Sequence, residues 1–111
     1  MSAFATALGN GALPLLKELY LFENQVGDAG LAALASACGS GALPLLTQLD
    51  LQFNRIGNAG LAALAEAVGS GALPSLTILY VNDGPLGAEH PLLKATCAER
   101  RIRLLTWHNT F

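Results

Sequence analysis

The stretch at residues 46–54 reads Leu-Thr-Gln-Leu-Asp-Leu-Gln-Phe-Asn, with leucine at its first, fourth and sixth positions and asparagine at its ninth. The same frame stands thirty residues earlier, at Leu16, Leu19, Leu21 and Asn24. It returns thirty residues later, at Leu76, Leu79, Val81 and Gly84, with glycine in place of the asparagine. A fixed period of this length is typical of a solenoid, in which each repeat buries its apolar face against its neighbours. The sequence therefore predicts a protein that works by presenting a surface.

The composition is that of one folded domain. A chain of 111 residues is a single domain by length, and 52% apolar with 13% charged residues disfavours disorder. No apolar run is long enough to span a bilayer, so we expect no membrane partner. Residues 1–4 lack the basic start of a secretory signal, and two cysteines are too few for a disulfide framework. We therefore expect a reduced, cytoplasmic setting.

The charge is distributed unevenly along the chain. Residues 1–93 carry two cationic and seven acidic side chains, a formal charge of −5, whereas residues 94–111 carry four cationic and one acidic, a formal charge of +3. A basic end could attract nucleic acid, but nucleic-acid binding needs a larger basic field. We therefore predict no nucleic-acid partner and interpret the basic residues as the solvated face of a cap.

Each repeat combines a strand, a turn, a helix and a second turn. The alternating leucines predict strands at residues 16–22, 46–52 and 76–82, which stack as a parallel sheet. Alanine-rich segments predict crossover helices at residues 28–38 and 58–68. Asp28 and Asn58 are expected to cap the starts of these helices, and Gly39 and Gly69 to end them in the left-handed conformation. Leu31, Leu34 and Cys38 lie on one face of the first helix, and we expect this face in the core. Leu61, Leu64 and Val68 lie on the equivalent face of the second helix.

Both ends of the chain depart from the pattern. Residues 1–8 match the tail of a helix and form a partial repeat, so the chain enters the array without a polar cap. The full repeats are predicted at residues 9–38, 39–68 and 69–98. In the last of these, Pro91 fits the first turn of a helix. Residues 99–111, with a charged turn and a shortened strand at residues 102–105, form the C-terminal cap strand and tail. We expect one domain over residues 1–111 that is the C-terminal part of a longer array.

The frame at residues 46–54, followed by Ile-Gly-Asn-Ala-Gly-Leu-Ala-Ala-Leu-Ala at residues 56–65, resembles the ribonuclease-inhibitor-like class of leucine-rich repeats. The same class occurs in NACHT-type immune receptors and in Ran GTPase-activating protein. The resemblance implies an α/β fold, a short right-handed solenoid with parallel strands on its concave face and helices on its convex face. It also implies that Asn24 and Asn54 form a buried ladder with backbone groups of the strand-to-helix turn. Gly84 interrupts that ladder in the third repeat.

If the leucines point inward, the residues between them form columns on the other face of the sheet. We predict one column of Glu18, Gln48 and Ile78, a second of Tyr20, Asp50 and Tyr80 with Arg103 beyond it, and a third of Phe22, Gln52 and Asn82. Aromatic side chains supply much of the energy at protein interfaces. The predicted partner-binding residues are therefore Glu18, Tyr20, Phe22, Asp50, Gln52, Tyr80, Asn82 and Arg103. Strand propensity alone also favours tyrosine and phenylalanine here, and that interpretation stays open.

The expected area of this face limits the affinity. Four strands about 4.8 Å apart and about 17–20 Å long offer a few hundred Å². A standard stable interface buries roughly 800 Å² per partner. We therefore predict weak binding by the isolated chain, with a longer array or self-association through the uncapped N-terminal end at residues 1–20 making up the difference.

The chemistry-bearing residues form no catalytic pattern. His90 and Cys97 would lie about 10 Å apart on one helix, too far for a nucleophile and its base. Spacings typical of metal ligands are absent, and the Gly-Ser-Gly turns precede strands rather than helices, unlike a phosphate-binding loop. We therefore predict no enzyme, no cofactor and no metal, and a protein that binds another protein. The alternatives are a passive structural or self-associating fragment and, by analogy of fold alone, a regulator of a GTPase.

Overall fold

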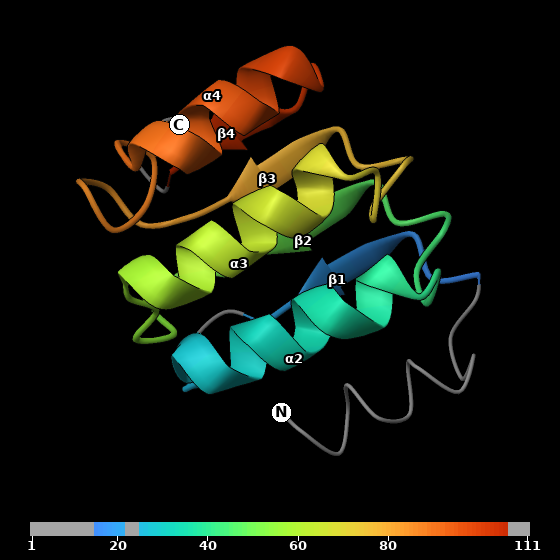
Figure 1. The fold of residues 1–111 in the computed structure, drawn as a ribbon, viewed down its shortest axis with the longest axis horizontal. Coiled ribbons are helices and arrows are strands. Elements are labelled where there is room, and N and C mark those ends of the chain that lie inside the picture. The colour runs from blue at the N-terminus through green and yellow to red at the C-terminus, as the bar shows by residue number, and fades with distance from the viewer. Residues whose placement is uncertain (1–14, 22–24, 107–111) are drawn as a thin grey trace.

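The computed structural model describes residues 15–21 and 25–106. Strands and helices alternate along this part of the chain (Figure 1). In chain order they are β1 (Glu18–Tyr20), α2 (Gly27–Gly39), β2 (Gln48–Asp50), α3 (Asn58–Gly69), β3 (Ile78–Tyr80), α4 (Pro91–Glu99) and β4 (Arg103–Leu105).

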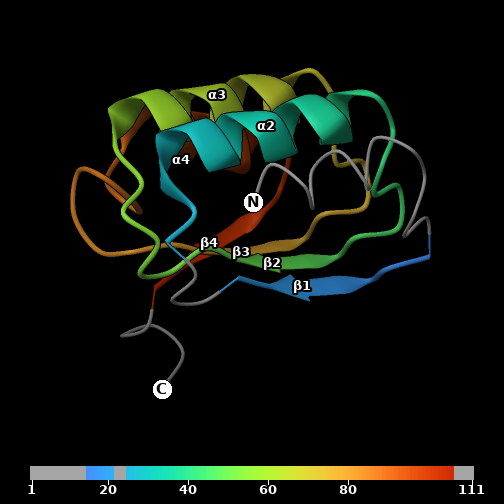
Figure 2. The same ribbon diagram turned by 90° about the horizontal axis from the view of Figure 1, so that it is seen from below.

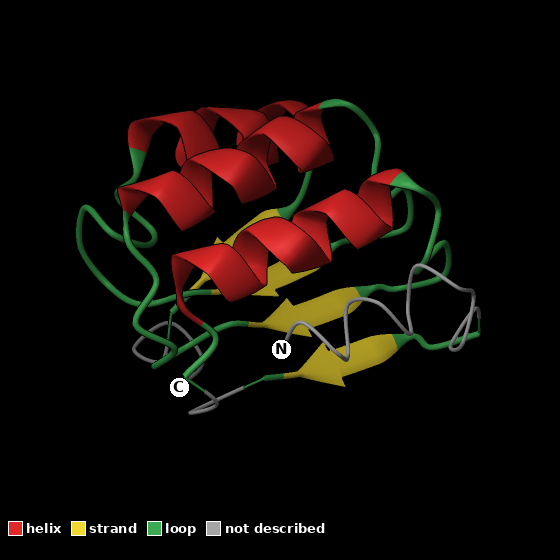
Figure 3. Ribbon diagram, turned by 60° about the horizontal axis from the view of Figure 1, so that its bottom comes forward, coloured by secondary structure: helices red, strands yellow, loops and turns green. Residues whose placement is uncertain are grey.

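The described strands form one parallel sheet in the order β1-β2-β3-β4. Leu19, Leu49 and Leu79 are Cα partners across the first three strands, so the repeats stack in register. The helices lie in a second layer that covers one face of the sheet (Figure 2), and all of them run side by side (Figure 3). This arrangement confirms the predicted α/β fold with parallel strands and crossover helices.

The core lies between the two layers. Leu49 and Leu79 are 1% and 0% exposed, as expected for the inward positions of the strands. The predicted helical faces are buried too, with Leu31, Leu34 and Cys38 from α2 and Leu61, Leu64 and Val68 from α3. At β1, however, Leu16, Leu19 and Leu21 are only partly buried against this core. The burial of the repeated leucines therefore increases from the first described repeat to the second.

The strands are shorter than predicted, with three residues each instead of seven. β1 and β3 end at tyrosines in the position equivalent to Asp50, so the short length is common to the repeats. After β2 the backbone N–H of Gln52 donates a hydrogen bond to Oδ1 of Asp50 at 3.0 Å, which forms an aspartate turn. Leu51 stays buried, but the residues after it follow the turn rather than the sheet.

The predicted helix caps are wrong in a way that links neighbouring repeats. Asp28 lies inside the first turn of α2 and does not cap it. Its Oδ1 instead accepts hydrogen bonds from the backbone N–H groups of Gly57 at 2.6 Å and Gly60 at 2.9 Å, at the start of α3. A Cβ atom at Gly57 or Gly60 would lie 2.9 or 2.6 Å from this carboxylate, so glycine makes the approach possible. One repeat thus caps the helix of the next.

The start of α4 is also contacted by a side chain of the preceding repeat, but through a histidine. Asn58 is the first residue of α3, and its Oδ1 lies 2.8 Å from Nε2 of His90. Nδ1 of His90 accepts a hydrogen bond from the backbone N–H of Leu93 at 3.3 Å and caps α4. Because Nδ1 is the acceptor, Nε2 carries the proton and donates to Asn58. The proline at position 91 stands at the start of α4, as the sequence predicts.

The helix ends also differ from the prediction. Gly39 and Gly69 are the last helical residues, but the left-handed conformation occurs two positions later, at Gly41 (φ +84°) and Gly71 (φ +89°). After α4 the equivalent residue is Arg101, with φ +58°. Its neighbour Arg100 donates a hydrogen bond from Nη2 to the backbone oxygen of Gly69 at the end of α3. This cation complements the partial negative charge of the helix terminus.

Candidate partner-binding face

The face of the sheet opposite the helices carries two rows of side chains, which we call the strand face. One row consists of Tyr20, Asp50, Tyr80 and Leu105, and the other of Glu18, Gln48, Ile78 and Arg103. The register of the parallel strands sets both rows, because Cα partners on neighbouring strands lie side by side. The predicted column of Tyr20, Asp50 and Tyr80 is confirmed.

The predicted position of Arg103 in that column is wrong. Arg103 pairs with Ile78, so it belongs to the row of Glu18, and Leu105 takes the place next to Tyr80. The reason is the length of the last repeat. Ile78 and Arg103 are separated by 25 positions instead of thirty, because the Gly-Ser-Gly-Ala-Leu-Pro turn is absent after α4.

Tyr20 is the most exposed aromatic residue of the strand face, at 55%. Its hydroxyl group donates to Oε1 of Glu18 at 2.9 Å and lies 3.4 Å from Oε1 of Gln48 on the next strand. The hydrogen bond to Glu18 is the largest cause of the raised pKa of Tyr20, followed by burial and by the charges of Glu18, Tyr80 and Asp50. Tyr20 therefore remains a neutral phenol, with its ring held by a carboxylate at its tip.

Asp50 is half-buried in the middle of its row. Its carboxylate accepts hydrogen bonds from the backbone N–H of Gln52, described above, and from Nε2 of Gln52 at 3.2 and 3.4 Å. Among the described residues no cation pairs with it. The orientation of the Asp50 carboxylate is thus set by uncharged donors, and its negative charge is not neutralised.

Gln52 is buried rather than exposed as alternation predicts, and its role as a contact residue stays a prediction. It is 6% exposed, and its Nε2 lies against the Asp50 carboxylate instead of extending a third column. Its Oε1 is buried without a hydrogen-bond partner. A buried acceptor without a donor is uncommon in folded proteins. The nitrogen of the same Gln52 side-chain amide donates to Asp50.

The side chain of Asn82 is held by a hydrogen bond within the protein. Its Oδ1 accepts a hydrogen bond from the backbone N–H of Phe53 at 2.9 Å, in the turn of the preceding repeat. Phe22, the remaining member of the predicted third column, lies outside the described residues. Only Asn82 of that column is both described and partly exposed, so no continuous third column forms among the described residues.

The predicted asparagine ladder is confirmed at Asn54, which is fully buried. Its Nδ2 donates to the backbone oxygens of Leu21 and Gln52, and its Oδ1 accepts from the backbone N–H of Val26 at 3.2 Å. Asn24 lies outside the described residues. The ladder fixes the strand-to-helix turns and so the register that aligns the rows of the strand face.

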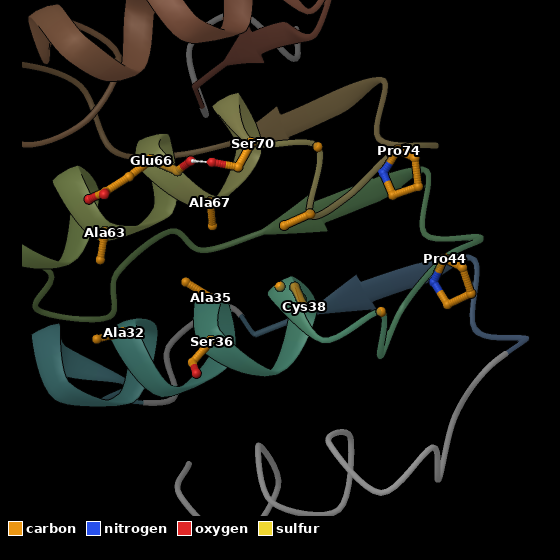
Figure 4. Close-up of a pocket in the computed structure, with 14 residues that line it drawn as sticks. Ala32, Ala35, Ser36, Cys38, Pro44, Ala63, Glu66, Ala67, Ser70 and Pro74 are labelled. Atoms are coloured by element: carbon orange, nitrogen blue, oxygen red, sulfur yellow. Dashed lines mark hydrogen bonds between the residues drawn. The ribbon is translucent and has the colours of Figure 1, made fainter.

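The helix side carries a groove that sequence analysis missed (Figure 4). It has a volume of about 510 Å³ and runs between α2 and α3. Small residues such as Ala35 and Ala67 line it, with Pro44 and Pro74 at one end and Glu66 as the charged group. The alanine spacing in both helices was the available signal, because small side chains on facing helices leave a space between them.

Both described cysteines and His90 are buried. Burial raises the pKa of the Cys38 and Cys97 thiols to about 11, so neither is a reactive thiolate near neutral pH. His90 is occupied at the start of α4. No group of three or more potential ligands gathers in the described part of the chain. No described helix has the length and apolar character that crossing a bilayer would require.

Comparison with known proteins agrees with this architecture. Residues 12–35 and 42–65 each match the family model described as Leucine Rich repeat, and each match spans a strand and most of the following helix. Two segments of the chain therefore have the sequence pattern of a leucine-rich repeat. No curated protein matches the chain significantly along its sequence. Leucine-rich repeats generally mediate protein–protein interaction and are typically not catalytic.

Proposed function

We propose that this chain is a non-catalytic module that binds a partner protein on the strand face, the concave side of such a solenoid. The observation that carries the proposal is the row of Tyr20, Asp50 and Tyr80, which the strand register aligns on the face that no described helix covers. The resemblance to ribonuclease-inhibitor-like repeats supports the same use of this face.

The side chains of the row are suited to recognition. Tyrosine provides a large amphipathic contact area with few rotatable bonds, and it is enriched at the centres of interfaces. Hydrogen bonds from Tyr20 to Glu18 and from Gln52 to Asp50 already restrict these side chains in the free chain. Less conformational entropy is then lost when a partner binds.

The size of the face supports weak, additive binding. Each described strand has three residues, which at about 3.3 Å per residue and about 4.8 Å between strands covers about 200 Å². That is less than the roughly 800 Å² that each partner contributes to a standard interface. The chain would therefore act as one segment of a longer repeat array, whose further strands extend the contact.

A pull-down with quantitative mass spectrometry tests the proposal. The bait proteins are the wild type, the double variant Tyr20→Ala/Tyr80→Ala, and a control variant Leu45→Ala/Leu92→Ala. The control removes two other exposed apolar side chains, 40% and 49% exposed, that lie outside the strand face. Specific partners should be lost from the tyrosine variant and retained by the control. Equal recovery by all three baits, each folded by circular dichroism, would disprove binding on the strand face.

A second candidate, self-association, is favoured by the partial burial of Leu16, Leu19 and Leu21 at β1. Their counterparts Leu46, Leu49 and Leu51 are at most 2% exposed. β1 also has a partner strand on one side only among the described strands. Pairing of two copies at this edge would extend the sheet. Light scattering over a hundredfold range of concentration should then show a mass that rises toward twice the monomer, and a constant monomer mass would exclude it.

A further inference from the structure

The spacing of the row Tyr20–Asp50–Tyr80 matches the size of a cationic side chain. Tyr20 and Tyr80 are each the Cα partner of Asp50, one strand away on either side. Two strand spacings put the Cα atoms of the tyrosines about 10 Å apart, so a group seated above Asp50 lies between the two side chains. Cations interact favourably with aromatic rings at up to about 6 Å from the ring centroid.

Among the described residues, no cation pairs with the two carboxylates of this area. Asp50 accepts hydrogen bonds from Gln52, and Glu18 accepts one from the hydroxyl of Tyr20. The cation in the rows of the strand face is Arg103 on β4, two strands from Asp50 and three from Glu18. At about 10 Å or more it is separated from them by roughly a Debye length in physiological salt.

The acceptors near Asp50 outnumber the donors. The carboxylate has two oxygens, and the adjacent amide of Gln52 has a buried Oε1 without a partner. The arginine side chain has five N–H donors in a plane, pairs with a carboxylate through two of them and stacks on aromatic rings. Lysine would supply charge but a compact, strongly hydrated donor group without the flat surface.

From these observations we propose that the row Tyr20–Asp50–Tyr80 is a receptor for an arginine side chain of the partner protein, seated between the tyrosine rings with its guanidinium on the Asp50 carboxylate. The proposal rests on the proposed function and specifies the partner, which carries an exposed arginine on a convex or extended segment. Glu18 attracts neighbouring positive charge on the same segment. The resulting contact is a charged anchor at the centre of an otherwise small interface.

A titration followed by NMR tests this receptor site directly. The probe is the capped tripeptide acetyl-Gly-Arg-Gly-amide, compared with versions that contain citrulline or lysine, and the protein is the ¹⁵N-labelled 111-residue chain. Citrulline has the length and shape of arginine without its charge. The arginine peptide should cause saturable shifts at residues 48–52 and 78–80 with a millimolar dissociation constant. Its affinity should exceed that of the citrulline peptide about tenfold, with lysine between them.

Two matched variants separate the charge of Asp50 from charge in general. Asp50→Asn removes the charge but keeps an oxygen that accepts from the N–H of Gln52, and it should reduce arginine binding to the citrulline level. Glu66→Gln removes one charge from the exposed side of α3 and should leave binding unchanged. Equal affinity for arginine and citrulline, arginine binding unaffected by Asp50→Asn, or no saturable shift with the arginine peptide overturns the proposal.

The pull-down with Asp50→Asn added distinguishes this inference from the function on which it rests. A partner lost from Tyr20→Ala/Tyr80→Ala and from Asp50→Asn supports both. A partner lost from the tyrosine variant but retained at full yield by Asp50→Asn leaves the strand face as the binding site and overturns the arginine receptor. A partner retained by both variants overturns the proposed function itself.

Discussion

The units β2–α3 and β3–α4 perform the same structural tasks with different side chains. In the turn after β2, the fully buried Asn54 bonds backbone groups of the preceding repeat. In the turn after β3, Gly84 stands at that position with φ +88°, and Asn82, two residues earlier, bonds the preceding turn instead. Asn54 satisfies several buried groups, whereas Asn82 satisfies one group at the exposed residue 53.

The starts of the two helices differ in the same manner. α3 is capped directly by Asp28 of the repeat before it, across Gly57 and Gly60. α4 is capped by its own His90, and the repeat before it contributes Asn58, which binds the far side of the imidazole ring. His90 occupies the position equivalent to Gly60, so the ring fills the space that glycine leaves open for a carboxylate.

The hydrogen bond between neighbouring repeats is therefore kept while its donor and acceptor change. Each turn and each helix start must satisfy backbone N–H groups that face the neighbouring repeat. Different side chains can do so, provided that the residue opposite makes room. Substitutions at matched positions of neighbouring repeats measure how much each arrangement contributes to stability.

The largest effect is expected at the ladder asparagine. Asn54→Ala leaves the backbone groups of Leu21, Val26 and Gln52 without their side-chain partner, and it should lower the free energy of unfolding by about 3 kcal/mol or more. Asn82→Ala removes one hydrogen bond and should lower it by about 1 kcal/mol. Urea denaturation of both variants measures the difference. Equal losses would mean that the two asparagines are equivalent and the comparison is wrong.

The next effect depends on pH and on Cys38, which stands where α3 has Val68. Burial raises the pKa of Cys38 from about 9 in the unfolded chain to about 11 in the fold. The folded state therefore holds a neutral thiol that the unfolded state ionises. Stability should be unaffected by this thiol below pH 9 and should fall as pH rises from 9 to 11, by at most about 3 kcal/mol.

Cys38→Val isolates this contribution, because Val68 shows that the position accommodates valine. The variant should match the wild type at pH 7 and lose less stability between pH 9 and 11. Cys97, with a pKa also raised to about 11, remains as the source of the residual decrease. If the free energy of unfolding falls by the same amount in both proteins between pH 9 and 11, the thiol at position 38 does not titrate as described.

A smaller effect is expected at the helix cap that crosses between repeats. Asp28→Ala should destabilise the chain by about 1–2 kcal/mol, because two N–H groups at the start of α3 lose their acceptor. Amide hydrogen exchange should accelerate at Gly60 more than at the start of α2. Asp28→Asn keeps an acceptor oxygen and should recover most of the loss. Faster exchange confined to α2 would assign Asp28 to its own helix, as the sequence predicted.

The smallest effect concerns the turns after α3 and α4. Gly71 and Arg101 hold equivalent left-handed positions, and only glycine does so without steric strain. Arg101→Gly should therefore raise the free energy of unfolding by up to about 1 kcal/mol, whereas Gly71→Ala should lower it by a similar amount. Thermal unfolding of both variants tests this. A destabilised Arg101→Gly would indicate that the arginine side chain contributes more than its backbone strain.

The repeat itself was predictable from the sequence, because hydrophobic periodicity determines which residues face the core. The leucine frame at residues 46–54 and its copies correctly predicted the parallel strands, their order and the row of Tyr20, Asp50 and Tyr80. The alanine-rich segments correctly predicted α2 and α3, and Pro91 the start of α4. These features depend on side-chain periodicity within one segment, which a single sequence displays.

The remaining features depend on contacts between repeats or on a change of period. Gln52 was assigned to the exposed surface by alternation, but its side chain packs against Asp50 and is buried. Arg103 was assigned to the wrong row because the last repeat is shorter. The partners of Asp28 and His90 lie in the adjacent repeat, about thirty residues away, where local capping rules do not apply.

We propose that the strand face meets the partner, and that the groove between α2 and α3 does not. Chemical-shift mapping of the ¹⁵N-labelled chain with a partner recovered in the pull-down tests it most directly. We predict that the largest shifts occur at Tyr20, Asp50 and Tyr80 and that Ala35 and Ala67 in the groove are unaffected. Shifts that concentrate at Ala35 and Ala67 while the row of Tyr20, Asp50 and Tyr80 stays unchanged would contradict the claim.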